Sequence, residues 1–270
     1  MKKVLVVGAT GQTGKHVVSQ LLQKGHIVSA IARSKQRLFD SINEIYSSSG
    51  DTLHDAAKDE KLSVTEAAIL DLTNEQISEQ ICNADAVVCC LGHNLTLKGV
   101  YGKPRRLVTD ATKRLCHAII THQEQQKNCD NKKMTKFILM GSDGVANPDG
   151  TDDKRSVLER TILCLIRALL PPHPDNEGAA RHLSNDVADE VQWVVVRPTD
   201  LINGAATKYN LFPKPRGSLF GSGCATRSNV AKCMVDLILE DGLWEEWKYK
   251  MPVLHDAEGT AGTTANGAKE

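Results

Sequence analysis

The stretch that decides the fold reads Val4-Leu5-Val6-Val7-Gly8-Ala9-Thr10-Gly11-Gln12-Thr13-Gly14. An apolar run typical of a buried strand passes through three glycines, spaced by three, into a segment typical of a helix. Gly8 allows a sharp turn, Gly11 allows the backbone to approach a pyrophosphate, and Gly14 allows close packing of the helix on the sheet. Free amide groups and the helix dipole would face the phosphates. The stretch predicts a dinucleotide cradle, and the alternative is a tight turn that holds no ligand.

Short β-branched runs alternate with amphipathic stretches over the first two hundred residues, which is typical of β-α-β units. The expected strands cover residues 3–7, 26–32, 64–70, 86–91, 136–140, 192–197 and 248–254. The expected helices cover residues 13–24, 74–81, 105–124, 154–170, 176–186 and 228–240, with a further short one at 35–46. The predicted fold class is α/β, a Rossmann-type doubly wound parallel sheet flanked by helices, with a small C-terminal region on the substrate side.

The length of 270 residues fits one large domain, expected over residues 1–256. Residues 257–270 are rich in Gly, Thr and Ala and are expected to form a disordered tail, and partial disorder is also expected around residues 47–59. The oligomeric state stays open between monomer and homodimer.

The composition argues against several classes of partner. Lys plus Arg number 33 and Asp plus Glu number 33, so there is no general attraction to nucleic acid or anionic lipid. No apolar run is long enough to span a membrane or to form a signal peptide, and the eight cysteines lack C-x-x-C spacing. A reduced chain in the cytoplasm is therefore expected, with a small molecule as its partner.

The second expected strand ends in Arg33-Ser34, where an NAD enzyme would offer an acidic residue to the ribose 2′-hydroxyl. Arginine there favours a 2′-phosphate, so NADP(H) is preferred and NAD(H) is possible, while a solvated loop arginine is the alternative. Asp71 lies where the adenine edge would reach, or it caps the next helix, as Thr73 also could. The candidate cofactor-binding residues are Gly8, Thr10, Gly11, Gln12, Thr13, Gly14, Arg33, Ser34, Asp71, Leu72, Leu91 and Gly92.

Four segments carry a family resemblance: the glycine turn, Phe137-Ile138-Leu139-Met140-Gly141-Ser142, Val194-Val195-Val196-Arg197-Pro198 and Thr226-Arg227-Ser228-Asn229-Val230-Ala231. Over residues 1 to about 255 the chain resembles the atypical short-chain dehydrogenase/reductases of the NmrA-like and flavin (biliverdin-IXβ) reductase-like group. The resemblance implies a strand order of 3-2-1-4-5-6-7, with substrate over the carboxyl ends of the strands.

The chain departs from the wider superfamily at the acid/base pair. Most active members use a tyrosine and a lysine four residues apart on one helix face, but none of the four tyrosines here is followed by such a lysine. The corresponding helix offers Asn176 and Ala180, neither of which is a strong acid or base.

Two residues are candidates for chemistry. The resemblance places Ser142 beside the nicotinamide, where it could hydrogen-bond a carbonyl, although it could also be a simple turn serine. His173 is the candidate proton donor, held by its Pro-Pro-His-Pro setting ahead of a helix that Asp175 could cap, and the alternative is an ordinary loop histidine. His93 and His182 are less favoured. No set of residues has zinc spacing, so no metal is expected.

Two further segments keep alternative interpretations. The basic cluster Lys103-Pro104-Arg105-Arg106, followed by Lys113-Arg114, could bind nucleic acid, but a solvated helix face is favoured because only Tyr101 could stack on a base. The apolar helix at 157–170 could cover the substrate pocket or form a subunit contact.

The favoured function is an NADPH-dependent reductase of a flat quinone, flavin or conjugated carbonyl that works without a Tyr/Lys pair. The alternative is a non-catalytic NADP(H)-sensing regulator or scaffold of the NmrA-like type. An isomerase or epimerase that keeps its nucleotide is a third, less favoured possibility.

Overall fold

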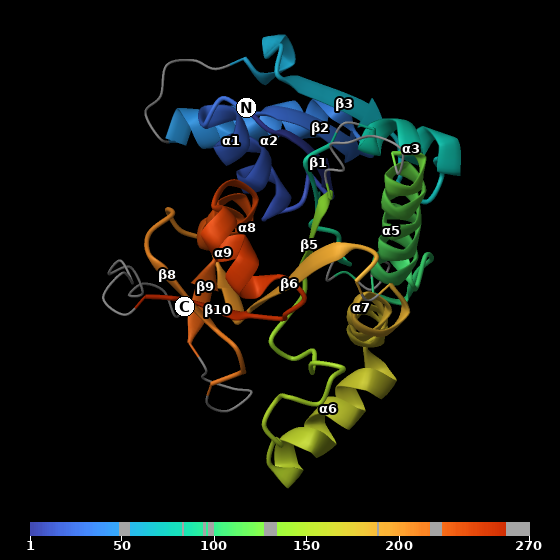
Figure 1. Cartoon of the computed structure of the whole chain (residues 1–270). Coiled ribbons are helices and arrows are strands. Elements are labelled where there is room, and N and C mark those ends of the chain that lie inside the picture. Colours follow the sequence, from blue (N-terminus) through green and yellow to red (C-terminus); the bar gives the residue numbers. More distant parts are fainter. Residues whose placement is uncertain are drawn as a thin grey trace.

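The computed structural model describes residues 1–48, 55–82, 84–93, 96, 100–126, 134–187, 189–216 and 223–257. Its centre is a sheet of order β3-β2-β1-β4-β5-β6-β10-β8, in which every neighbouring pair is parallel except β10 and β8 (Figure 1). The strands are β1 (Lys3–Val7), β2 (Ile27–Ala32), β3 (Leu62–Glu66), β4 (Ala86–Cys89), β5 (Lys136–Met140), β6 (Gln192–Pro198), β8 (Tyr209–Phe212) and β10 (Val253–Asp256). Two short strands, β7 (Asp200–Ile202) and β9 (Cys224–Thr226), pair separately.

The predicted strand order is confirmed, with β10 as the seventh strand, and β8 adds an antiparallel edge that was not foreseen. The strand expected at 248–254 is wrong in its bounds. The helix α9 ends at Trp247, and the regular strand begins only at Val253. Residue Lys250 makes only a single bridge to β6. The third strand also starts earlier than expected and ends at Glu66, before the apolar residues 67–70.

Helices cover both faces of the sheet, as expected for a doubly wound fold (Figure 1). One face carries α1 (Gly14–Gln23), α2 (Lys35–Ser48), α8 (Arg227–Leu239) and α9 (Asp241–Trp247), and the other carries α3 (Asn74–Ile81), α5 (Leu107–Gln125) and α7 (Pro172–Arg181). The helix α6 (Val157–Leu169) projects away from the sheet. Among the described residues, no helix is long and apolar enough to cross a membrane.

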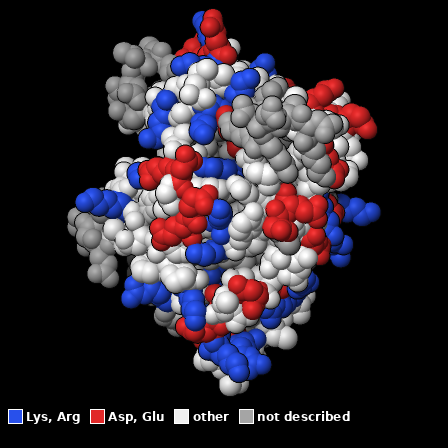
Figure 2. Space-filling view, viewed as in Figure 1, with Lys and Arg blue, Asp and Glu red and all other residues white. Residues whose placement is uncertain are grey.

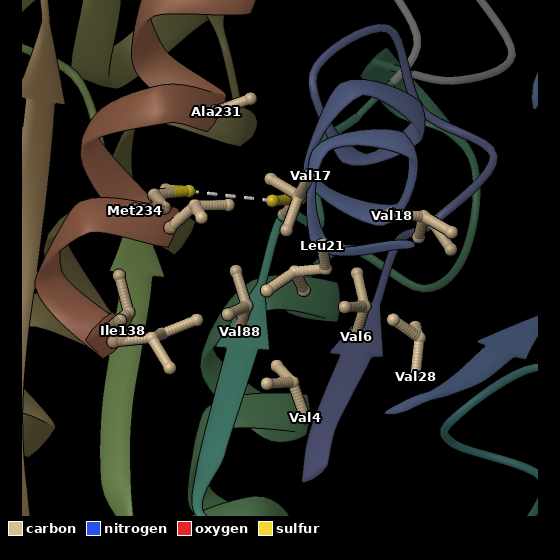
Figure 3. Packing of buried hydrophobic residues seen from close by; sticks show 14 of the residues in the cluster. Val4, Val6, Val17, Val18, Leu21, Val28, Val88, Ile138, Ala231 and Met234 are labelled. Carbon is tan, nitrogen blue, oxygen red and sulfur yellow. Dashed lines mark hydrogen bonds between the residues drawn. The ribbon is translucent and has the colours of Figure 1, made fainter. Parts of the chain in front are cut away.

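Alternating side chains of the strands feed two separate cores. Val4 and Val6 of β1 face α1 and α8, where Leu21 and Met234 meet them (Figure 3), whereas Leu5 and Val7 face the α5 side. The neighbours Cys89 and Cys90 divide in the same way, as expected for adjacent strand residues. Cys90 Sγ lies 3.7 Å from Met234 Sδ.

Two expectations for the α7 region are wrong. The helix begins at Pro172, a residue type well suited to a first helical position, so His173 lies in its first turn and not ahead of it. Asp175 is likewise inside α7 and does not cap it. A short π-helical turn, His182–Asp186, continues the helix.

The partial disorder expected around residues 47–59 falls in part on residues outside the described part, and the structure describes regular elements only at its two ends. Helix α2 runs to Ser48, and Ala56–Lys58 forms a short 3₁₀ turn. The backbone N–H of Ala56 donates to Asn43 Oδ1 of α2 at 3.0 Å, which ties this turn to the helix. Residues 49–54 and the expected tail from residue 258 onward lie outside the described part.

Candidate functional site

The glycine turn has the tight geometry that its sequence requires. Gly8 adopts a φ of +81°, and a Cβ there would lie 2.7 Å from the carbonyl carbon and oxygen of Cys90. A Cβ on Gly14 would overlap the carbonyl oxygen of Gly8, and Gly11 N–H donates to that same oxygen at 2.9 Å. Thr13 makes no side-chain cap, and α1 has no acidic residue in its first turn. The start of α1 therefore suits an external anion.

A cleft of about 620 Å³ opens at this turn, between the carboxyl ends of β1, β2 and β4. Its size is within the range of cofactor sites. The predicted residues that line it are Gly8, Thr10, Gly11, Gln12, Thr13, Arg33, Asp71, Leu91 and Gly92. Gly14, Ser34 and Leu72 are not among its lining residues.

The end of β2 brings two arginines to the cleft. Ser34 Oγ accepts from Arg37 N–H at 3.3 Å, so Ser34 caps α2 and places Arg37 in the first turn beside Arg33. Within the described part of the chain, neither guanidinium has an ion pair or a side-chain hydrogen bond, and both line the cleft. Lys35 turns away, with Nζ 5.5 Å from the centre of the Phe39 ring. Sequence reasoning missed Arg37, although its position one helical turn after Arg33 was a usable signal.

Asp71 lines the cleft and does not cap α3, because Thr73 does so in a capping box with Gln76. Thr73 Oγ1 accepts from Gln76 N–H at 3.2 Å, and Gln76 Oε1 accepts from Thr73 N–H at 2.8 Å. The helix-cap interpretation of Asp71 is therefore wrong.

Arg114 of α5 holds the cleft wall around Asp71. Its Nη1 donates to the carbonyl oxygens of Ile69 at 3.1 Å and Leu70 at 3.0 Å, and its Nη2 donates to that of Leu72. One member of the basic cluster is thus a structural arginine. Figure 2 shows Lys and Arg intermingled with Asp and Glu on the visible face, with no large area of one sign.

The predicted chemical residues Ser142 and His173 lie close to each other but outside the lining of the cleft. Ser142 Oγ accepts from Gly144 N–H at 3.3 Å, and a Cβ on Gly144 would lie 3.6 Å from His173 Cε1. Ser142 therefore serves a turn, while a chemical role for either residue stays a prediction.

His173 belongs to an ion-pair network between α6 and α7. Its Nε2 lies 3.2 Å from Glu177 Oε1 without an aligned hydrogen bond, and Arg167 Nη2 lies 2.7 Å from the same oxygen. Burial opposes ionisation of Glu177, but the neighbouring His173 and Arg167 outweigh it and lower the pKa of this carboxyl to about 2. His173 is thus engaged with Glu177.

A second histidine, His93, lines the cleft and contacts a buried carboxylate. Its Nε2 lies 2.8 Å from Asp175 Oδ2. The same carboxylate accepts from the backbone N–H groups of Val108 at 2.8 Å and Thr109 at 2.9 Å, at the start of α5. Sequence reasoning missed this pair because its members are 82 residues apart.

The fold and the cleft together define a Rossmann-type dinucleotide-binding protein. The chain belongs to the NAD(P)H-binding family, whose match covers residues 8–241. An uncharacterised chloroplastic protein of Arabidopsis thaliana is 25% identical over 244 residues, which are 89% of this chain and 73% of that protein.

Solved structures share the fold. A candidate NADH-flavin reductase from Streptococcus pneumoniae TIGR4 has a TM-score of 0.61 at 18% identity, with 95% of this chain and 100% of that chain covered. ChuY, an anaerobillin reductase from Escherichia coli O157:H7, has a TM-score of 0.60 at 14% identity, with coverage of 96% and 100%. The expected family resemblance is confirmed.

Proposed function

We propose that the protein binds NADP(H) in the cleft and acts as a reductase of a flat acceptor, such as a quinone, a flavin or a conjugated carbonyl. The observation that carries the proposal is the meeting of the glycine turn with Arg33 and Arg37 in one cleft. Two cations without ion-pair partners in the described part of the chain would hold a 2′-phosphate by charge-assisted hydrogen bonds.

Each part of the cleft has a role in this proposal. The amides at the start of α1 would hold the pyrophosphate, and Asp71 would contact the adenine edge. Leu91 and Gly92 would lie below the nicotinamide ribose, where a Cβ on Gly92 would meet nothing within 4 Å. When bound, the reduced dinucleotide supplies a hydride.

The acceptor class follows from the missing Tyr/Lys pair. Asn176 and Ala180 stand on α7, where the pair would be expected, and neither can act as a strong acid. A conjugated acceptor suits such a site because the negative charge that it gains is delocalised. A flavin is an acceptor of this kind, and the Streptococcus pneumoniae neighbour is a candidate NADH-flavin reductase. In this proposal Ser142 would orient the acceptor from the end of β5.

Calorimetry with NADPH and NADH tests the nucleotide preference. Arg33→Gln and Arg37→Gln are each expected to weaken NADPH binding by about 1 to 3 kcal/mol, because a charge-assisted hydrogen bond to phosphate is lost. NADH binding should hardly change. Lys35→Gln is the matched control, since Lys35 faces Phe39. Equal weakening of both nucleotides would remove the arginines from the proposal.

The second candidate is a cofactor-sensing protein that binds NADP(H) without turnover. The absence of Ser142 and His173 from the cleft lining favours it. Steady oxidation of NADPH by a panel of quinones, abolished by Gly11→Asp, would support the enzyme. Tight binding with no oxidation, together with a partner protein recovered in one redox state only, would support the sensor.

The proposal also includes a reducing compartment such as the cytoplasm and a single domain over residues 1–256.

A further inference from the structure

We propose that His93 donates the proton that accompanies hydride reduction of the acceptor, and that Asp175 positions it. The inference rests on the proposed reductase function and supplies the acid that the missing tyrosine would have provided. It assigns to His93 the role that the sequence had suggested for His173.

The pair is built into the interior of the protein. The side chains of His93 and Asp175 are only 4% and 1% exposed, and their 2.8 Å contact joins the end of β4 to α7. Asp175 is itself fixed, since Val108 and Thr109 donate their backbone N–H groups to its carboxylate. Thr109 Oγ1 also donates to the Asp175 carbonyl oxygen at 2.7 Å. A histidine held in this way keeps one ring orientation.

The contact also determines which ring nitrogen of His93 bonds to Asp175 and which one can release a proton. A carboxylate accepts hydrogen bonds, so His93 Nε2 carries the hydrogen that points to Asp175. Nδ1 is then the atom at which the imidazolium can release a proton. His93 is next to Gly92 in the lining of the cleft, together with Leu107 and Met140.

The other two candidate histidines lack this combination. His173 faces Glu177, and His182 Nδ1 lies 2.8 Å from Asp186 Oδ2 in a pair whose carboxylate is 56% exposed. Neither histidine lines the cleft, whereas His93 does. The His182–Asp186 pair therefore matches the His93–Asp175 pair in its contact distance but lies outside the site.

Hydride reduction of the acceptor consumes one proton in addition to the hydride. Reduction delivers a hydride, which is two electrons and one hydrogen nucleus, to the acceptor and leaves negative charge on its oxygen or nitrogen. The N–H bond at His93 Nδ1 breaks as an O–H or N–H bond forms on that atom. The neutral imidazole then regains one proton from solvent. Donation by a positioned acid accelerates such a step by roughly 100- to 10,000-fold.

The test compares His93→Gln with the matched control His182→Gln. In His93→Gln, oxidation of NADPH by quinones and conjugated carbonyls is expected to fall at least about 100-fold. Calorimetric affinity for NADPH should stay within about 3-fold, because glutamine can still donate to Asp175. His182→Gln should match the wild type in both measurements.

A spectroscopic readout separates chemistry from folding. The wild-type protein should show a low-field imidazole N–H proton signal from the His93–Asp175 hydrogen bond, which moves when NADP⁺ is added. His93→Gln should lose this signal and His182→Gln should keep it. Asp175→Asn should lower kcat at least about 10-fold while leaving the KM for NADPH within about 2-fold, since the amide oxygen can still accept at the start of α5 but no longer holds His93 as a carboxylate does.

The two proposals fail in different ways. If wild-type protein binds no nicotinamide nucleotide, the proposed function itself is wrong. If it binds and turns over, but His93→Gln is as active as the wild type, the reductase stands and the proton-donor assignment is overturned. Binding without turnover across the acceptor panel also overturns that assignment.

Discussion

Gly8 and Gly14 show how two missing Cβ atoms determine the position of a helix. The carbonyl oxygen of Gly8 sits where a Cβ of Gly14 would be, and the backbone of Cys90 sits against Gly8. The turn is therefore in close contact with the end of the neighbouring strand β4 on one side and with the start of α1 on the other. Strand β1 and helix α1 can approach this closely only if both positions lack side chains.

Gly14→Ala is expected to lower the free energy of unfolding by at least about 2 kcal/mol, since the new methyl group would overlap a backbone oxygen that cannot move away. Gly92→Ala is the matched control. A Cβ there meets nothing within 4 Å, so its stability should stay within about 0.5 kcal/mol of the wild type. Urea unfolding of the three proteins checks both values, and equal stability of both variants would contradict the packing argument.

The cysteines should divide by burial when the native protein is alkylated. Burial raises the pKa of the Cys89 thiol to about 12 and raises the pKa values of Cys90 and Cys116 as well, so these thiols do not form the reactive thiolate. Cys82 and Cys164 are exposed. Iodoacetamide at neutral pH followed by mass spectrometry should label the exposed pair first. Rapid labelling of Cys90 in folded protein would contradict its burial in the core.

At the scale of elements, the sequence predicted those whose pattern is local. β1 and β5 have the expected bounds because each is an apolar run with clear breaks on both sides. The start of α7 was missed because Pro171 and Pro172 read as a stop signal, although proline is equally suited to a first turn. Strands β7 and β9 are three residues each, too short to leave a periodic signal.

The contact between α6 and α7 predicts a pH dependence. The pKa of Glu177 is lowered from 4.5 to about 2, so its stabilising contribution is fully present above pH 4.5 and is lost as the pH falls toward 2. Glu177→Gln should therefore lower the free energy of unfolding by about 1 kcal/mol at pH 6 and by less at pH 3. Urea unfolding at the two pH values measures the difference. A cost that is larger at pH 3 would have the wrong sign.

Arg114→Gln is expected to destabilise the protein by about 1 to 3 kcal/mol, because carbonyl oxygens of residues 69, 70 and 72 lose a charged donor. It should also weaken NADPH binding, since the wall that carries Asp71 is then less well held. The exposed neighbour Lys113 provides the control, and Lys113→Gln should leave both thermal unfolding and calorimetric affinity unchanged.

For the molecule as a whole, the strand order and the cleft at the glycine turn could be predicted, because a doubly wound sheet brings the carboxyl ends of β1, β2 and β4 to one edge. The His93–Asp175 pair could not. It depends on how α7 lies against the start of α5, which no local pattern encodes. The β8 edge and α9 also depend on contacts between distant segments.

Helix α6 lies apart from the cleft at the glycine turn. None of its residues lines the cleft, and Val157, Leu158, Leu165 and Leu169 are more than half exposed. The double change Leu158→Gln with Leu165→Gln should therefore leave NADPH affinity unchanged and stability within about 0.5 kcal/mol. Leu163 is only 6% exposed, so Leu163→Ala should lower the free energy of unfolding by about 2 kcal/mol or more. Calorimetry and urea unfolding give both values, and weaker NADPH binding by the double variant would place α6 at the cleft.

Arg114 grips the segment from Ile69 to Leu72 through carbonyl oxygens alone, which every amino acid possesses. The position of this wall is consequently independent of the side chains that it displays toward the cleft. Side chains at 70 and 71 can be exchanged to suit a different purine or a different base contact while the main chain stays anchored. For a designer of altered cofactor preference, this short segment is the natural place to vary first.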